Sequence, residues 1–169
     1  MSIGLIFIRL VVGLTLGAHG AQKLFGWFGG YGLQATGAGM EKMGFVPGWR
    51  SALFAGLAEA GGGLLLALGL ATPLAAAIGF AVMVVAGASA HLKNGFFLSK
   101  GGYEYTLILA SVALGLAFTG PGSLSLDSAL GLALGGPTWG LAALAVGLAG
   151  AGLQLGLRRP AKQDSPAHA

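Results

Sequence analysis

Long apolar runs, separated by short polar or glycine-rich connections, make up most of this chain. Five of them predict membrane-spanning helices, because about 20 residues of apolar helix cross the hydrocarbon core of a bilayer. These runs lie at about residues 3–23, 51–70, 74–92, 103–119 and 137–157. A short interfacial helix is expected over 32–45 and ends before Pro47. Ser125 or Asp127 can cap a further short helix after the fourth run.

Composition supports an all-α membrane protein. Hydrophobic types make up 55% of the chain and charged types 8%, whereas a soluble domain carries about 25% charged residues. The absence of cysteine excludes disulfides and thiolate metal sites. The net charge of +4 indicates no nucleic-acid partner, because the cations cluster at predicted helix ends.

The basic residues predict an orientation. With five spans, all lysines and arginines except Arg9 fall on one side, which the positive-inside rule makes cytoplasmic. The N-terminus is then outside and the C-terminus inside. The residues concerned are Lys23, Lys42, Arg50, Lys93, Lys100, Arg158, Arg159 and Lys162.

Polar residues from four of the predicted helices share this cytoplasmic half. His19 and Lys23 are four residues apart and lie on one helix face, and Glu59 lies roughly 12 Å inside the second span. The others are Gln22, His91, Asn94, Tyr103, Glu104 and Tyr105. Ionisable residues inside a membrane face the bundle interior and pair or line a pathway. We therefore predict a polar pocket, closed by the loops at 27–31 and 96–97.

Structural explanations remain open for each residue. Glu59 can form an ion pair with Lys23 or Arg9. Arg9 can instead extend to the nearer membrane surface, and His19 and Lys23 can be ordinary interfacial residues. His91 can simply be a histidine at a helix end, and Tyr103 and Tyr105 can belong to the aromatic belt at the membrane interface. Glu104 can complement the dipole of the helix that it begins.

A metal site is not expected. His19, Glu59, His91 and Glu104 include ligand types that suit iron or zinc, and two histidines can in principle bind haem. However, the sequence contains no HExxH or ExxH motif to place such ligands on one helix face.

Short motifs follow one another along the first four predicted spans and their connections. They are Arg9-Leu10 with Gly13, His19-Gly20-x-x-Lys23-Leu24-Phe25-Gly26, Glu59-x-Gly61-Gly62, His91, Asn94-Gly95-Phe96-Phe97, Gly102-Tyr103-Glu104-Tyr105, Gly120-Pro121-Gly122 and Ser125-Leu126-Asp127. Their order and spacing resemble the DoxX family of small bacterial and archaeal membrane proteins. The resemblance covers about residues 5–128 and implies a four-helix domain over 1–128, located in the inner membrane. A fifth helix within 129–157 and a basic, disordered cytoplasmic tail over 158–169 are additions.

Members of this family are described as small subunits of quinol oxidases or of thiosulfate:quinone oxidoreductases. The resemblance implies a quinone or quinol ligand and a partner oxidoreductase subunit, since the chain has no redox cofactor of its own. Glu59, His19 and His91 are then the expected catalytic residues, and Arg9 forms a structural ion pair. The expected ligand-binding residues are Lys23, Gln22, Asn94, Tyr103, Glu104 and Tyr105. A non-catalytic scaffold, a small-solute or proton carrier, and a homo-oligomer remain alternatives.

Overall fold

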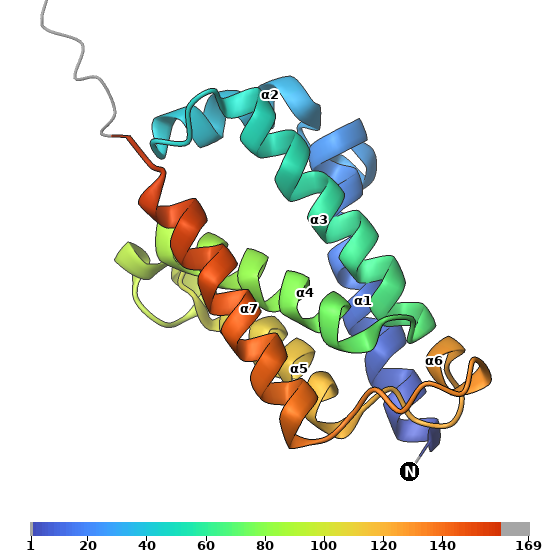
Figure 1. Ribbon diagram of the computed structural model, residues 1–169. Helices are drawn as coiled ribbons and strands as arrows, with labels where there is room; N and C mark the ends of the chain where they lie inside the picture. Colours follow the sequence, from blue (N-terminus) through green and yellow to red (C-terminus); the bar gives the residue numbers. More distant parts are fainter. Residues whose placement is uncertain (1, 160–169) are drawn as a thin grey trace, which may run out of the picture.

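The computed structural model describes residues 2–159, and within that range the chain is helical and contains no strand. Five longer helices form the bundle in Figure 1. They are α1 (Ser2–Phe25), α3 (Gly48–Leu68), α4 (Thr72–Ala86), α5 (Glu104–Thr119) and α7 (Pro137–Gly156). The shorter helices are η1 (Trp27–Gly29), α2 (Gly32–Lys42), η2 (Gly87–His91), η3 (Leu92–Asn94), η4 (Leu98–Lys100) and α6 (Leu126–Ala129). The predicted all-α fold is confirmed.

Four helical stretches are long and apolar enough to span a membrane: Ile3–Phe25, Gly48–Leu68, Thr72–Asn94 and Pro137–Gly156. The remaining apolar helix, α5, is shorter at 16 residues. At 1.5 Å per residue it measures about 24 Å, less than the hydrocarbon thickness of about 30 Å. The chain is therefore a multi-pass membrane protein.

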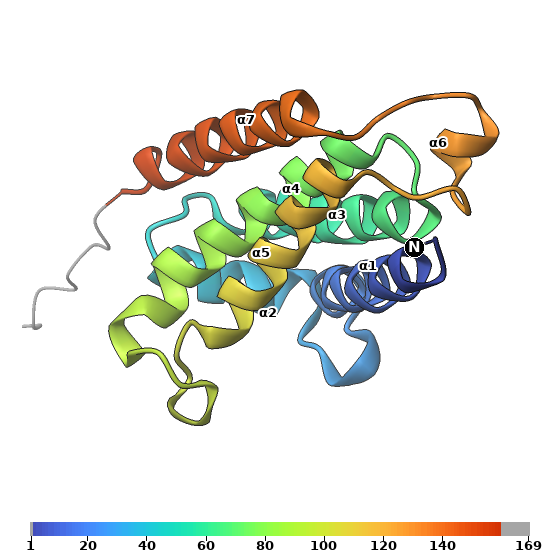
Figure 2. The ribbon, with the colours of Figure 1, turned by 90° about the horizontal axis from the view of Figure 1, so that it is seen from below.

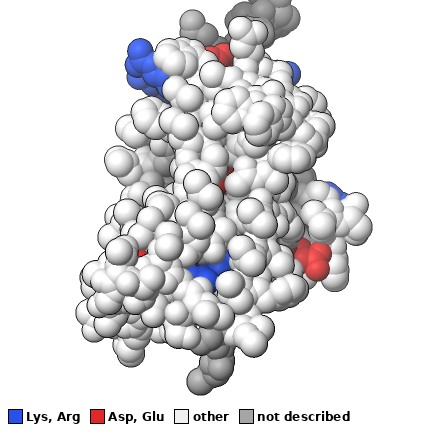
Figure 3. All heavy atoms as spheres, turned by 90° about the vertical axis from the view of Figure 1, so that its right-hand side faces the viewer, with Lys and Arg blue, Asp and Glu red and all other residues white. Residues whose placement is uncertain are grey.

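The surface agrees with contact to lipid. Large apolar side chains such as Phe7, Phe54 and Leu153 are more than 60% exposed. Figure 3 shows a face on which charged side chains appear only as small, isolated patches. A soluble monomer rarely exposes apolar surface on this scale, so these side chains face the acyl chains of the bilayer.

Helix ends follow local backbone chemistry. α3 begins at Gly48, three residues before the predicted start at Ser51, because the extended Pro47 occupies its N-cap position. α2 ends at Lys42, short of the predicted residue 45. Ser125 caps α6 by accepting a hydrogen bond from the Ser128 amide at 3.1 Å, and this predicted cap is confirmed.

Glycines set the distance between α1 and α3. A Cβ atom on Gly13 would lie 2.5 Å from the Gly63 carbonyl oxygen and 2.6 Å from the Ala67 nitrogen. A Cβ on Gly20 would lie 2.6 Å from the Gly56 carbonyl oxygen. Such contacts are too short for any side chain, so the two backbones touch, as small residues permit in membrane helices. The contact brings His19, next to Gly20, level with Glu59.

Substitution of Gly20 by alanine tests this packing. We expect Gly20→Ala to lower the free energy of unfolding by about 1–3 kcal/mol, because α1 and α3 must move apart. Gly17→Ala is the matched control on the same helix, since a Cβ there has no atom within 4 Å. Reversible unfolding in mixed detergent micelles measures both. Equal effects of the two substitutions would contradict the close contact.

α7 covers the other side of the bundle. It lies along α4 and α5, on the far side of them from α1 (Figure 2). Gly140 and Gly147 of α7 lie against the rings of Phe118 and Phe80, where a Cβ would come within 2.6 Å of the Phe80 ring. The buried core between these helices includes Ala76, Ala113 and other small residues. Residues 160–169, most of the predicted tail, lie outside the described part of the chain.

Candidate functional site

An ion pair links α1 to α3 inside the bundle. Lys23 Nζ donates to Glu59 Oε2 at 2.5 Å. Among the described residues, 2–159, it is the one salt bridge between side chains. The Glu59 side chain is 2% exposed, whereas that of Lys23 is 24% exposed. Gly20 of α1 lies against Gly56 and Ala60 of α3, so Lys23 is about one helical turn beyond the level of Glu59. Its long side chain reaches back to the carboxylate. Of the two predicted partners of Glu59, Lys23 and Arg9, the one that forms the ion pair is Lys23.

A second polar pair joins α1 to α5 beside this one. His19 Nε2 and the Tyr105 hydroxyl are 3.0 Å apart, and the two rings meet edge to face with centroids 5.7 Å apart. The Glu59 carboxylate interacts electrostatically with both His19 and Tyr105. Four predicted site residues from three helices therefore form one polar cluster: His19, Lys23, Glu59 and Tyr105.

Lys23 also lines a pocket formed by the end of α1, the loop that follows it and α2. The pocket has a volume of about 200 Å³. Its lining residues are Gln22, Lys23, Gly29, Gly30, Tyr31 and Thr36. Gln22 holds the loop in place, because its amide Nε2 donates to the Phe28 carbonyl oxygen at 3.1 Å. Lys23 thus lies between a buried carboxylate and an accessible pocket.

The remaining predicted site residues hold the connection between α4 and α5. His91 Nδ1 donates to the Gly101 carbonyl oxygen at 2.8 Å, and Asn94 Nδ2 donates to the same oxygen at 3.1 Å. Glu104 accepts a hydrogen bond from the Leu98 amide at 2.9 Å, and Tyr103 packs edge-on against the Phe96 ring. Each of these four side chains therefore has a structural role in this connection. Their part in binding stays a prediction.

Arg9 has a different neighbour from those considered in the sequence. It is 1% exposed, and its Nη2 donates to the Leu124 carbonyl oxygen at 2.5 Å. The carboxylate that acts on it electrostatically is Asp127, not Glu59. Among residues 2–159, Arg9 Nε and Nη1 have no hydrogen-bond partner.

Asp127 anchors the end of the bundle opposite to the polar cluster. Its carboxylate, fully buried, accepts hydrogen bonds from the Ala71 amide at 2.7 Å, the Thr72 amide at 2.9 Å and the Thr72 hydroxyl at 2.7 Å. We missed the role of Asp127 in the sequence, although a signal for its influence on Arg9 was present. With five spans, Asp127 is the acidic residue that falls on the same side of the membrane as Arg9.

Within the described range, no group of three or more His, Cys, Asp or Glu side chains is arranged to hold a metal ion. The polar cluster instead offers a cation, a carboxylate, an imidazole and a phenol. These groups can donate hydrogen bonds to a ligand oxygen and can pass protons between them.

Comparison with known proteins places this arrangement in a family. The DoxX family model matches residues 4–92, which is more than half of the 169-residue chain. The matched range includes His19, Lys23 and Glu59, whereas Tyr105 and α7 lie beyond it. No curated protein and no solved structure matches the chain. By the family match, this protein is a member of the DoxX family.

Proposed function

We propose that the protein binds a quinone or quinol headgroup in the pocket beside Lys23 and serves as the membrane subunit of an oxidoreductase system. Membership of the DoxX family supports the general setting, because the family is often linked to oxidoreductase systems. The observation that carries the proposal is the position of Lys23, which touches the buried Glu59 on one side and the accessible pocket on the other.

The residues that line the pocket suit a quinone ring. A quinone presents two carbonyl oxygens, which need donors, and Lys23, Tyr31 and Thr36 all carry donor groups. The volume of about 200 Å³ accommodates a headgroup ring and not an isoprenoid tail. The tail would extend past the exposed apolar rings of Trp27 and Phe28 into the lipid.

The polar cluster supplies a means to handle protons. Reduction of a bound quinone takes up two electrons and two protons, and the electrons come from a partner oxidoreductase. Lys23 can give a proton to a ligand oxygen and recover it through Glu59, while His19 and Tyr105 extend the chain of polar groups across to α5. Loss of a proton from Lys23 would leave Glu59 without a counter-charge, so transfer between these two groups is coupled.

Quinone content of the purified protein tests the proposal. We expect wild-type protein in mild detergent to retain quinone and Lys23→Met to retain at least about tenfold less, because a charge-assisted hydrogen bond contributes about 1.5–3 kcal/mol. Solvent extraction and chromatography measure the quinone retained per chain. Lys100→Met, the same change on an exposed connection, should retain the wild-type amount.

A second variant separates ligand loss from misfolding. The double variant Lys23→Met/Glu59→Leu removes both charges and should fold, yet should still lose the quinone. A double variant that folds and retains quinone in full would rule out this site. A wild-type protein that never retains quinone would do the same.

The scaffold reading has its own support. The Lys23–Glu59 pair and the His19–Tyr105 contact both cross helix boundaries, so they can serve only to hold α1, α3 and α5 together. Under that reading, the folded double variant should still support assembly and turnover of the partner oxidoreductase. Loss of turnover with assembly intact would favour the quinone site.

A further inference from the structure

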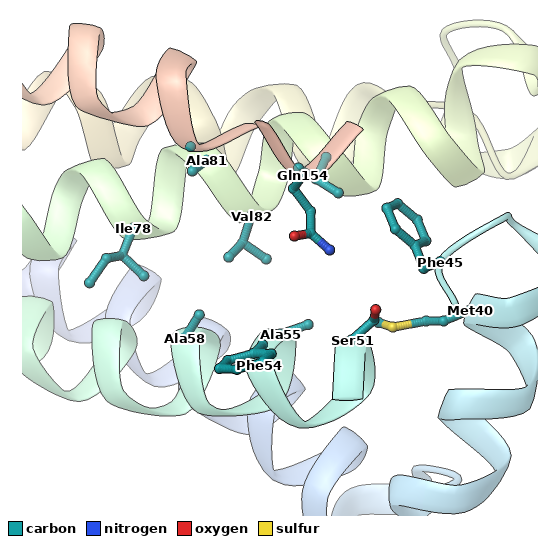
Figure 4. Close-up of a pocket in the computed structure, with 12 residues that line it drawn as sticks. Met40, Phe45, Ser51, Phe54, Ala55, Ala58, Ile78, Ala81, Val82 and Gln154 are labelled. Carbon is teal, nitrogen blue, oxygen red and sulfur yellow. The ribbon is translucent and has the colours of Figure 1, made fainter. Parts of the chain in front are cut away.

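An apolar groove runs between α3, α4 and α7, away from the pocket beside Lys23. Its volume is about 260 Å³, and Met40 and Phe45 close one end (Figure 4). Phe54 and Val82 contribute apolar side chains to its walls. Figure 4 shows the Gln154 amide pointing from α7 into this space. The two cavities share no lining residue, so the groove is a separate feature of the molecule.

Small residues keep the groove open. Ala55 and Ala58 face it from α3, Ala81 from α4 and Gly150 from α7. A Cβ on Gly150 would have Ala81 Cβ as its neighbour, at 3.9 Å, so the helices are not in tight contact there. An apolar recess of this kind stays dry and accepts apolar ligands. At the depth of the bilayer core, the available material is hydrocarbon chain.

Cationic residues lie near the closed end of the groove. The Arg158 guanidinium lies 5.3 Å from the centroid of the Phe45 ring, and its Nε donates to the Met43 carbonyl oxygen at 2.8 Å. Arg50, next to the lining residue Ser51, is exposed and lies 5.3 Å from the Trp49 ring centroid. Lys42 is exposed at the end of α2.

Among residues 2–159, the acidic residue in this region is Glu41, which is already engaged. Its Oε1 accepts a hydrogen bond from the Gly48 amide at 2.9 Å, as a cap on the start of α3. Within the described range, the end of the groove therefore carries an excess of positive charge, near the start of α3 and just after the end of α7. Lysine and arginine placed there attract anionic lipids, by about 1 kcal/mol each.

We propose that the groove binds one acyl chain of an anionic phospholipid, whose phosphate lies between Arg158 and Arg50. Guanidinium groups match phosphate oxygens with paired hydrogen bonds, and the apolar walls receive the chain. Gln154, which lines the groove four residues before Arg158, can donate to an ester carbonyl oxygen. The bound lipid fills the space between α7 and α3. This site depends on α7, which lies outside the matched DoxX range, and does not depend on quinone binding.

Lipid titration of the intact protein tests the headgroup. Native mass spectrometry in detergent measures binding of phosphatidylglycerol and phosphatidylcholine with identical acyl chains. We expect phosphatidylglycerol to bind about tenfold more tightly. Arg50→Gln/Arg158→Gln should abolish that preference, whereas Lys93→Gln/Lys100→Gln, which removes the same charge from another connection, should keep it. Equal binding of the two lipids by the wild type would overturn the proposal.

Filling the groove tests the acyl chain without touching the charges. Gly150→Leu places a side chain in the groove and should weaken phosphatidylglycerol binding at least about tenfold. Gly152→Leu is the control on the same helix, because a Cβ there meets open space and Gly152 does not line the groove. If Gly150→Leu binds phosphatidylglycerol as the wild type does, the proposal fails. It fails equally if the molecule that Gly150→Leu displaces is a quinone.

Discussion

Replacement of Asp127 by alanine is expected to give the largest loss of stability of any single substitution considered, about 3–5 kcal/mol of unfolding free energy. The change removes three hydrogen bonds, to the Ala71 amide and to the amide and hydroxyl of Thr72. It also leaves the Arg9 guanidinium, which is 1% exposed, without its nearby counter-charge. Unfolding in mixed micelles, followed by circular dichroism, measures the change.

Two further variants check the cause of that loss. Ser128→Ala, the matched control on the same short helix, alters an exposed side chain and should change stability by less than about 0.5 kcal/mol. Arg9→Met/Asp127→Asn removes the buried charges together and should recover much of the loss. If the double variant is no more stable than Asp127→Ala, the electrostatic role of the pair is wrong.

Replacement of Lys23 by methionine is the second large effect. We expect Lys23→Met to lower the unfolding free energy by about 3 kcal/mol, because Glu59 is 2% exposed and would lose its ion-pair partner. Lys23→Met/Glu59→Leu should be close to the wild type in stability, since it leaves no buried charge. The same unfolding measurement, completed with Glu59→Leu, gives a double-mutant cycle.

The outcome of this cycle distinguishes two views of the pair. A large coupling energy between Lys23 and Glu59 agrees with the buried salt bridge. A coupling energy near zero would mean that Glu59 finds another partner in the lipid-embedded protein. Lys100→Met, on an exposed connection, should leave the stability unchanged and controls for the general effect of a lost surface charge.

The helices could be predicted from the sequence because apolar runs of sufficient length leave few alternatives in a membrane. The rotation of each helix about its axis could not. All-round apolar helices give little periodic signal, so the sequence placed His91 and Glu59 at a common depth without showing which way each side chain points. The chain before His91 also passes into a π-helix over Gly87–His91. A π-helix changes the direction of following side chains, and nothing in the sequence indicated it.

The polar contacts between helices could likewise be predicted only in part. Proximity of His19, Lys23 and Glu59 could be anticipated, because the five-span topology puts all three in the same half of the membrane. The choice of Lys23 over Arg9 as the partner of Glu59 required the structure. Arg9 lies on the same helix but at the opposite end of the bundle, where it donates to the Leu124 carbonyl oxygen and where Asp127 is the carboxylate that influences it. Depth along the membrane, rather than residue type, decides these pairs.

Photoaffinity labelling with an azidoquinone tests most directly whether the pocket beside Lys23 is the quinone site. We predict labelled peptides that contain the pocket-lining segment from Gln22 to Thr36, with labelling reduced by unlabelled quinone and by Lys23→Met but not by Lys100→Met. Labelling spread over the lipid-facing helices, or confined to the groove beside α7, would contradict the account.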